Sequence, residues 1–207
     1  MNESLLDLLL KQASARGAGI IADRFGVDEA TVERAMAGAL PLIIGALARN
    51  ASTPGGAASL ERALARKHDG SLLDAAVDFL GGGDLADGSA ILDHVFGGRR
   101  GTVVETVATA SGLDSAHTSQ LFAMLAPLVL AYLGRERAEQ DLDADGVAEV
   151  LERQRSAIER APDPNDLSVL GQLARKLLDR DRDGQRAGDA VAIGVDLLDQ
   201  FMRDRQG

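Results

Sequence analysis

The sequence predicts an all-α protein, in which a compact helical domain is followed by a charged helical hairpin at the C-terminus. Aromatic residues make up only 3% of the 207-residue chain. Runs of β-branched residues at every second position are missing, so a β-sheet is disfavoured. Glycine-rich segments at 81–83 and 97–98 indicate turns between short helices. Hydrophobic residues at 45% and charged residues at 26% are ordinary for a folded domain and exclude wholesale disorder.

Three helices can be expected from local signals in chain order. An apolar helix is expected near the N-terminus, because five leucines fall within residues 5–10. A long helix is expected after Asp28, since its carboxylate is a good N-cap and the acidic Glu29 suits the positive helix end. A second long helix is expected after Asp114 or Ser115 for the same reason.

Two segments that lie 86 residues apart repeat one pattern. Each contains a glycine, a capping aspartate two residues later, and a proline thirteen residues after the aspartate, at Pro41 and Pro127. A proline inside a helix removes one hydrogen bond and bends the helix, at a cost of about 3 kcal/mol. We therefore predict an internally duplicated kinked-helix unit, although chance similarity between two helices rich in Leu and Ala is the alternative. The predicted copies lie near residues 20–64 and 106–153.

Charge density divides the chain into two parts. Charged residues number 25 in the first 134 positions and 29 in the last 73, so the second part must keep a larger solvated face. Pro162-Asp163-Pro164-Asn165 is the clearest linker. The expected organisation is a helical domain over residues 1–160 and a helix, acidic loop and helix over residues 161–207.

Charge and hydropathy also bear on partners and location. A net charge of −10 argues against nucleic-acid binding, which needs a basic surface. The N-terminus lacks the basic start of a secretory signal. The longest apolar stretches, 35–48 and 121–134, have about 14 residues, fewer than the roughly 20 that span a bilayer. We therefore expect a cytoplasmic protein without a transmembrane segment.

Several short motifs stand out beside the repeat. They are Leu5-Leu6-Asp7-Leu8-Leu9, Ala39-Leu40-Pro41-Leu42-Ile43-Ile44-Gly45 with Asn50-Ala51, His68-Asp69-Gly70-Ser71-Leu72-Leu73-Asp74, Ile91-Leu92-Asp93-His94-Val95-Phe96-Gly97, Ser111-Gly112-Leu113-Asp114 and Met124-Leu125-Ala126-Pro127-Leu128-Val129. Together they resemble the bacterial YidB-like family, domain of unknown function family 937, over most of residues 1–150 and again near residue 179. The resemblance implies a small all-α bacterial domain and no established activity, so it transfers no catalytic residue.

An acidic loop near the C-terminus is the first candidate site. Alternating carboxylates followed by Gly184 match the first half of a calcium-binding EF-hand loop, in which positions 1, 3 and 5 supply side-chain oxygens and position 7 a backbone carbonyl. Asp189 could act as a further ligand, one residue before the position where an EF-hand has a bidentate glutamate. The predicted calcium ligands are Asp179, Asp181, Asp183, Gln185 and Asp189.

This loop also departs from the calcium-binding pattern. Ala190 stands where the bidentate glutamate belongs, and Arg186 stands where an apolar residue is usual. Arg180 and Arg182 alternate with the aspartates and would weaken cation binding. The family that the chain resembles commonly has glycine at position 182. An acidic turn between two helices, with Asp and Arg neutralising each other, is the alternative.

Two other constellations have weaker support. The segment 141–146 with Glu152 also fits the EF-hand spacing, but a turn with an aspartate N-cap, followed by an inward-packed apolar face, explains it equally. His68 and His94 each lie beside an Asp-Gly-Ser turn and could converge on zinc with a carboxylate, although no short-range ligand spacing supports this. The apolar residues expected to pack inward after the 141–146 turn are Val147, Val150 and Leu151.

No motif for nucleophilic catalysis is present in the sequence. The chain has no Cys, no Gly-x-Ser-x-Gly and no phosphate-binding glycine loop. The leading prediction is a non-enzymatic interaction or scaffold domain that binds an unknown protein partner or a second copy of itself. A calcium-responsive module is the alternative. An enzyme such as a carboxylate-dependent hydrolase would need a deep polar pocket with buried acids.

Overall fold

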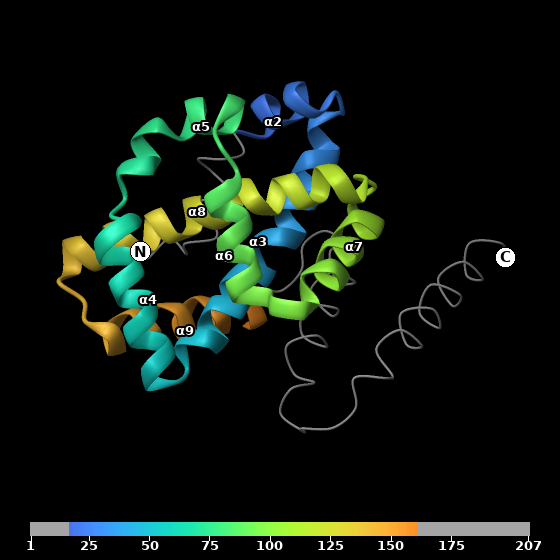
Figure 1. Ribbon diagram of the computed structural model, residues 1–207. Coiled ribbons are helices and arrows are strands. Elements are labelled where there is room, and N and C mark those ends of the chain that lie inside the picture. The colour runs from blue at the N-terminus through green and yellow to red at the C-terminus, as the bar shows by residue number, and fades with distance from the viewer. Residues whose placement is uncertain (1–16, 161–207) are drawn as a thin grey trace, which may run out of the picture. The chain divides into compact units, whose positions relative to one another are not determined.

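The computed structural model describes residues 17–160, and every regular element in that range is a helix (Figure 1). This confirms the predicted all-α class. The apolar segment at residues 5–10 and the predicted C-terminal hairpin lie outside the described residues. The elements are α2 (Ala18–Phe25), α3 (Glu29–Ala51), α4 (Pro54–Lys67), the 3₁₀ helix η2 (Ser71–Ala75), α5 (Ala76–Gly82), α6 (Ala86–Phe96), the 3₁₀ helix η3 (Gly97–Arg99), α7 (Arg100–Ser111), α8 (Ser115–Gln140) and α9 (Ala144–Arg160).

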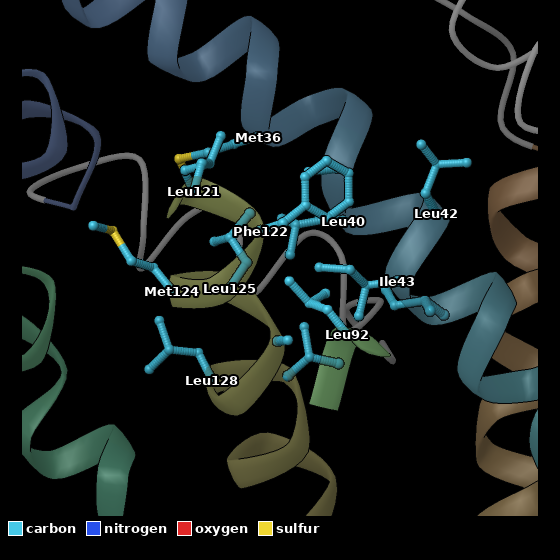
Figure 2. Packing of buried hydrophobic residues seen from close by; sticks show 14 of the residues in the cluster. Met36, Leu40, Leu42, Ile43, Leu92, Leu121, Phe122, Met124, Leu125 and Leu128 are labelled. Atoms are coloured by element: carbon cyan, nitrogen blue, oxygen red, sulfur yellow. The ribbon is translucent and has the colours of Figure 1, made fainter. Parts of the chain in front are cut away.

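The long helices α3 and α8 carry most of the core. Every residue of α8 from Leu121 to Ala131 is buried, so other parts of the chain surround this helix on all sides. Leu40 of α3, Leu92 of α6 and Phe122 of α8 are at most 1% exposed, and they pack together in one cluster (Figure 2). A helix that is apolar all round belongs in a protein interior or in a membrane.

The same two helices pass a length and composition test for membrane spans. Their most apolar windows have mean hydropathies of 1.4 and 1.3, and 72% of each window is buried inside the protein. Counting only uninterrupted apolar stretches of about 14 residues missed this, because the longer windows also include polar or charged residues, such as Arg34 in α3. Burial by neighbouring helices is what the core of a folded domain shows, and the absence of a transmembrane segment stays a prediction.

The predicted N-cap Asp28 is confirmed, and of the two candidates Asp114 and Ser115 the N-cap is Asp114. Asp28 precedes α3 and accepts a hydrogen bond from the Thr31 amide at 2.9 Å. Asp114 precedes α8 and accepts from the amides of Ala116 and His117 at 3.0 Å. The helices before the caps, α2 and α7, each end at a glycine with positive φ, 69° at Gly26 and 80° at Gly112. Pro41 and Pro127 lie inside continuous helices.

The order of elements around these caps is the same twice along the chain. A short helix, a long helix containing a proline, and a third helix follow one another as α2, α3 and α4, and again as α7, α8 and α9. The intervening segment from η2 to α6 has no counterpart in this order. The duplication itself stays a prediction, which a superposition of the two triplets would test.

Side chains of α2 and α3 donate hydrogen bonds to backbone carbonyl groups at the C-terminal ends of α5, α6 and α7. The guanidinium of Arg24 donates to the Leu80 carbonyl in α5 at 2.9 Å. Arg34 donates to the carbonyl of Ser111, the last residue of α7, at 3.2 Å. The Asn50 amide donates to the carbonyl of Val95 near the end of α6 at 3.4 Å. The last carbonyls of a helix lack intrahelical donors, so these bonds fix α5, α6 and α7 against α2 and α3.

Two glycines allow backbone to meet backbone. A Cβ atom on Gly88 of α6 would lie 1.8 Å from the Ala123 carbonyl oxygen of α8. A Cβ atom on Gly134 of α8 would lie 1.6 Å from the His68 carbonyl oxygen. Any side chain at Gly88 or Gly134 would force the two packed elements apart. Glycine at these positions therefore allows the short distance between the backbones of those elements.

Candidate functional site

The predicted calcium ligands belong to a part of the chain that the structure does not describe. Asp179, Asp181, Asp183, Gln185 and Asp189 lie outside the described residues. Within residues 17–160, no group of three or more His, Asp or Glu side chains is arranged to hold a metal ion.

The second acidic loop is a capping turn. Asp141 has a left-handed conformation, with φ of 50°, and ends α8. Asp143 accepts a hydrogen bond from the Gly146 amide at 2.9 Å, and α9 begins at Ala144. A helix therefore starts at the fourth position of the supposed twelve-residue loop, where an EF-hand needs open backbone. The alternative, a turn with an aspartate N-cap, is confirmed, and the side chains that pack inward are Val147, Val150 and Leu151, at 1%, 5% and 0% exposure.

The histidines occupy separate environments. His68 is buried, and its Nε2 lies 3.8 Å from Oδ2 of Asp87. Burial lowers the pKa of His68, and the nearby carboxylate of Asp87 partly opposes this. His94 is exposed in the last turn of α6. The ring of His117 stacks on Phe25 with centroids 4.5 Å apart. Within residues 17–160, His68 and the carboxylates near it do not form a group that could hold a metal ion.

An open depression lies where the end of α3 and the start of α4 meet α9. Its volume is about 370 Å³. Figure 1 shows α4 and α9 beside the C-terminal end of α3, which is drawn in cyan. The lining residues are Ala48 and Ala51 of α3, Ser52 and Thr53 of the turn, Pro54 and Ala57 of α4, and Asp145, Ala148, Glu149 and Glu152 of α9.

The floor of the depression is apolar and its rim is acidic. The alanine side chains of α3 and α4 that line it are buried, whereas its three carboxylate residues are exposed. Both hydroxyl groups of the lining are used in local turns. Thr53 accepts from the Gly56 amide at 3.2 Å and caps α4, and Ser52 donates to the Arg49 carbonyl at 2.7 Å.

The polar side chains that line the depression are two hydroxyl groups and three carboxylates. Within the described part of the chain, no His or Lys lines the depression to activate a hydroxyl group. Hydrogen bonds from Arg155 lower the pKa of Glu152 below its ordinary value. The depression was missed from the sequence because its walls come from segments nearly 100 residues apart. One signal was present, since Asp145, Ala148 and Glu152 recur at helical spacing along one face of α9.

Comparisons with known proteins give a family and no activity. The family model described as bacterial protein of unknown function, family 937, matches residues 7–136. No curated protein and no solved structure matches the chain. The matched region covers more than half of the sequence and includes both prolines, both N-caps and the segment from η2 to α6. The chain therefore belongs to the bacterial domain of unknown function family 937, as its YidB-like motifs indicated.

Proposed function

We propose that this protein is a non-enzymatic helical interaction domain, and that it binds a protein partner in the depression between α3, α4 and α9. The observation that carries this proposal is the depression itself, which combines an apolar floor with a charged rim. Protein interfaces commonly have an apolar centre surrounded by polar groups. The partner is another protein or a second copy of this chain.

The lack of buried carboxyl groups among the described residues supports binding over hydrolysis. A hydrolase that uses carboxylates needs an acid in a buried pocket, where desolvation raises its pKa. Among residues 17–160, the buried polar side chains are three hydroxyl groups and one imidazole, and no Asp or Glu is among them. The buried polar residues are Thr31, His68, Ser111 and Thr118.

A matched pair of photo-reactive side chains tests this proposal. A benzophenone amino acid replaces Ser52, which lines the depression and is exposed, or Ala110, which is exposed on α7. Ultraviolet light on living cells should give a discrete crosslinked product for the variant at position 52 and none for the variant at position 110. Mass spectrometry then distinguishes a second copy of this chain from another protein. Equal products at both positions, or no product at position 52, would contradict the proposal.

The calcium-responsive alternative is supported only by the sequence pattern of the acidic loop near the C-terminus. It depends on Asp179, Asp181, Asp183, Gln185 and Asp189, which the structure does not describe. No contact among the described residues favours it.

A further inference from the structure

The carboxylates of the depression share one face of α9. Asp145, Glu149 and Glu152 follow at intervals of four and three residues, which places them on one side of the helix. Glu152 is paired with Arg155 at 2.6 Å, and Glu149 lies 3.9 Å from Arg153. Asp145 has neither a hydrogen bond nor an ion pair with the described residues. The rim therefore keeps one carboxylate, that of Asp145, without a cationic partner among the described residues.

The floor of the depression offers methyl groups and no hydrogen-bonding side chain. Ala48, Ala51 and Ala57 are 6%, 3% and 2% exposed, and Ala148 is half-buried beside them. Such a floor matches the aliphatic stem of a long side chain rather than a polar head. Lys and Arg lay their stems along apolar surface while the charged head reaches polar groups. A volume of about 370 Å³ leaves room for one such side chain.

We infer that the occupant of the depression is a basic segment of a protein partner, with an arginine or lysine stem on the alanine floor and its cation at the carboxylates of α9. This inference rests on the proposed function, because it names the chemistry of the partner at the same site. The net charge of −10 adds a long-range attraction for a basic segment and repels an acidic one. Arginine suits the rim better than lysine, since its planar group can bond to carboxylates through two N–H groups.

Two peptides that differ only in charge provide the test. One is a short helical peptide of alanine and leucine with arginines along one face, and the other has citrulline at those positions, which keeps the stem but removes the charge. Each peptide is titrated into the ¹⁵N-labelled full chain, and amide chemical shifts report where it binds. Shifts should concentrate at the α3–α4 turn and the first half of α9. The arginine peptide should bind about threefold to tenfold tighter than the citrulline peptide, because the carboxylates are exposed and each charge pair with them contributes only up to about 1 kcal/mol.

A charge-matched pair of double variants separates the depression from overall charge. Asp145→Asn with Glu149→Gln removes two charges from the rim. Asp23→Asn with Glu33→Gln removes two exposed charges, one in α2 and one in α3, and Glu33 lies about 27 Å from Ala51 along α3 at 1.5 Å per residue. Only the first pair should abolish the preference for arginine. All four positions are exposed, so neither double variant should disturb the fold.

The results that would overturn the inference differ from those that would overturn the proposed function. Equal binding of the two peptides, shifts outside the depression, or equal losses in both double variants would overturn the inference. If neither peptide binds while the Ser52 variant still gives a crosslinked product, the inference fails and the proposed function stands. If the Ser52 variant gives no product, the proposed function fails. A second copy of this chain crosslinked through an acidic segment would also overturn the inference.

Discussion

Single glycine residues set the closest contacts in the domain. Gly88 lies in α6 where α6 crosses α8, and a methyl group there would meet the Ala123 carbonyl oxygen. Gly101 lies in α7, and a methyl group there would meet nothing within 4 Å. Alanine substitutions at Gly88 and Gly101 therefore separate the effect of packing on stability from the effect of helix propensity.

Replacing Gly88 by alanine should destabilise the protein. Alanine favours a helix by about 1 kcal/mol over glycine, but the clash with backbone that cannot move cheaply should cost more, for a net loss of about 2 kcal/mol. Gly101→Ala should leave the stability unchanged or raise it by up to about 1 kcal/mol. Urea unfolding measures both variants. Equal stabilities would show that α6 and α8 are not in backbone contact at Gly88.

His68 should make the stability depend on pH. Burial lowers the pKa of His68 in the folded state below its value of 6.5 in a free chain, although Asp87 opposes part of this shift and Lys67 adds to it. Below pH 6.5 the unfolded chain therefore binds a proton that the folded protein resists, so stability falls as the pH drops through this window. Urea unfolding between pH 7.5 and 5.5 should show this fall.

The fall should be smaller in His68→Gln than in the wild-type protein. His94→Gln serves as the control, because His94 is exposed in α6. The same pH slope in His68→Gln and in the wild-type protein would contradict the assignment of the buried imidazole as its source.

At the scale of elements, capping aspartates define where the long helices begin. Asp114 accepts hydrogen bonds from two backbone amides, and Asp28 accepts from one amide and from the Thr31 hydroxyl at 2.7 Å. These bonds hold the pKa of each carboxyl group below its ordinary value, the largest cause being the backbone amide of His117 for Asp114 and the Thr31 hydroxyl for Asp28.

Loss of the Asp114 cap should destabilise the protein by about 1 kcal/mol, the usual cost of replacing an aspartate N-cap by alanine. Asp114→Asn keeps an acceptor oxygen and should retain most of the stability. Thermal unfolding of both variants at pH 7 measures the difference. If the alanine and asparagine variants unfold at one temperature, the carboxylate does not act as a cap.

The starts of the long helices could be predicted because capping is a local interaction. The Gly-x-Asp pattern and the proline spacing predicted α3 and α8, and the structure begins both helices directly after the predicted aspartates. The turn at Asp143 was predicted as one of two alternatives for the same reason. The 141–146 segment shows the limit of spacing alone, because it matches an EF-hand in sequence yet forms a helix from Ala144.

At the scale of the whole molecule, contacts between distant segments decide the candidate site. Ala51 and Ala148 are nearly 100 residues apart and line one depression, so no local pattern could pair them. The bond from Arg34 to the Ser111 carbonyl likewise joins residues 77 positions apart. The ion pair between Glu61 and Arg137 also joins distant positions and holds α4 against α8.

A scan of photo-reactive positions tests the central claim most directly, namely that the protein acts by binding a partner in the depression. The benzophenone amino acid is placed in living cells at one exposed position per surface region, and the crosslinked products are compared. The account predicts a product at Ser52 and none at Val77 of α5, Ala90 of α6 or Ala110 of α7. Products clustered on α5, α6 or α7, or no product at any position, would contradict it.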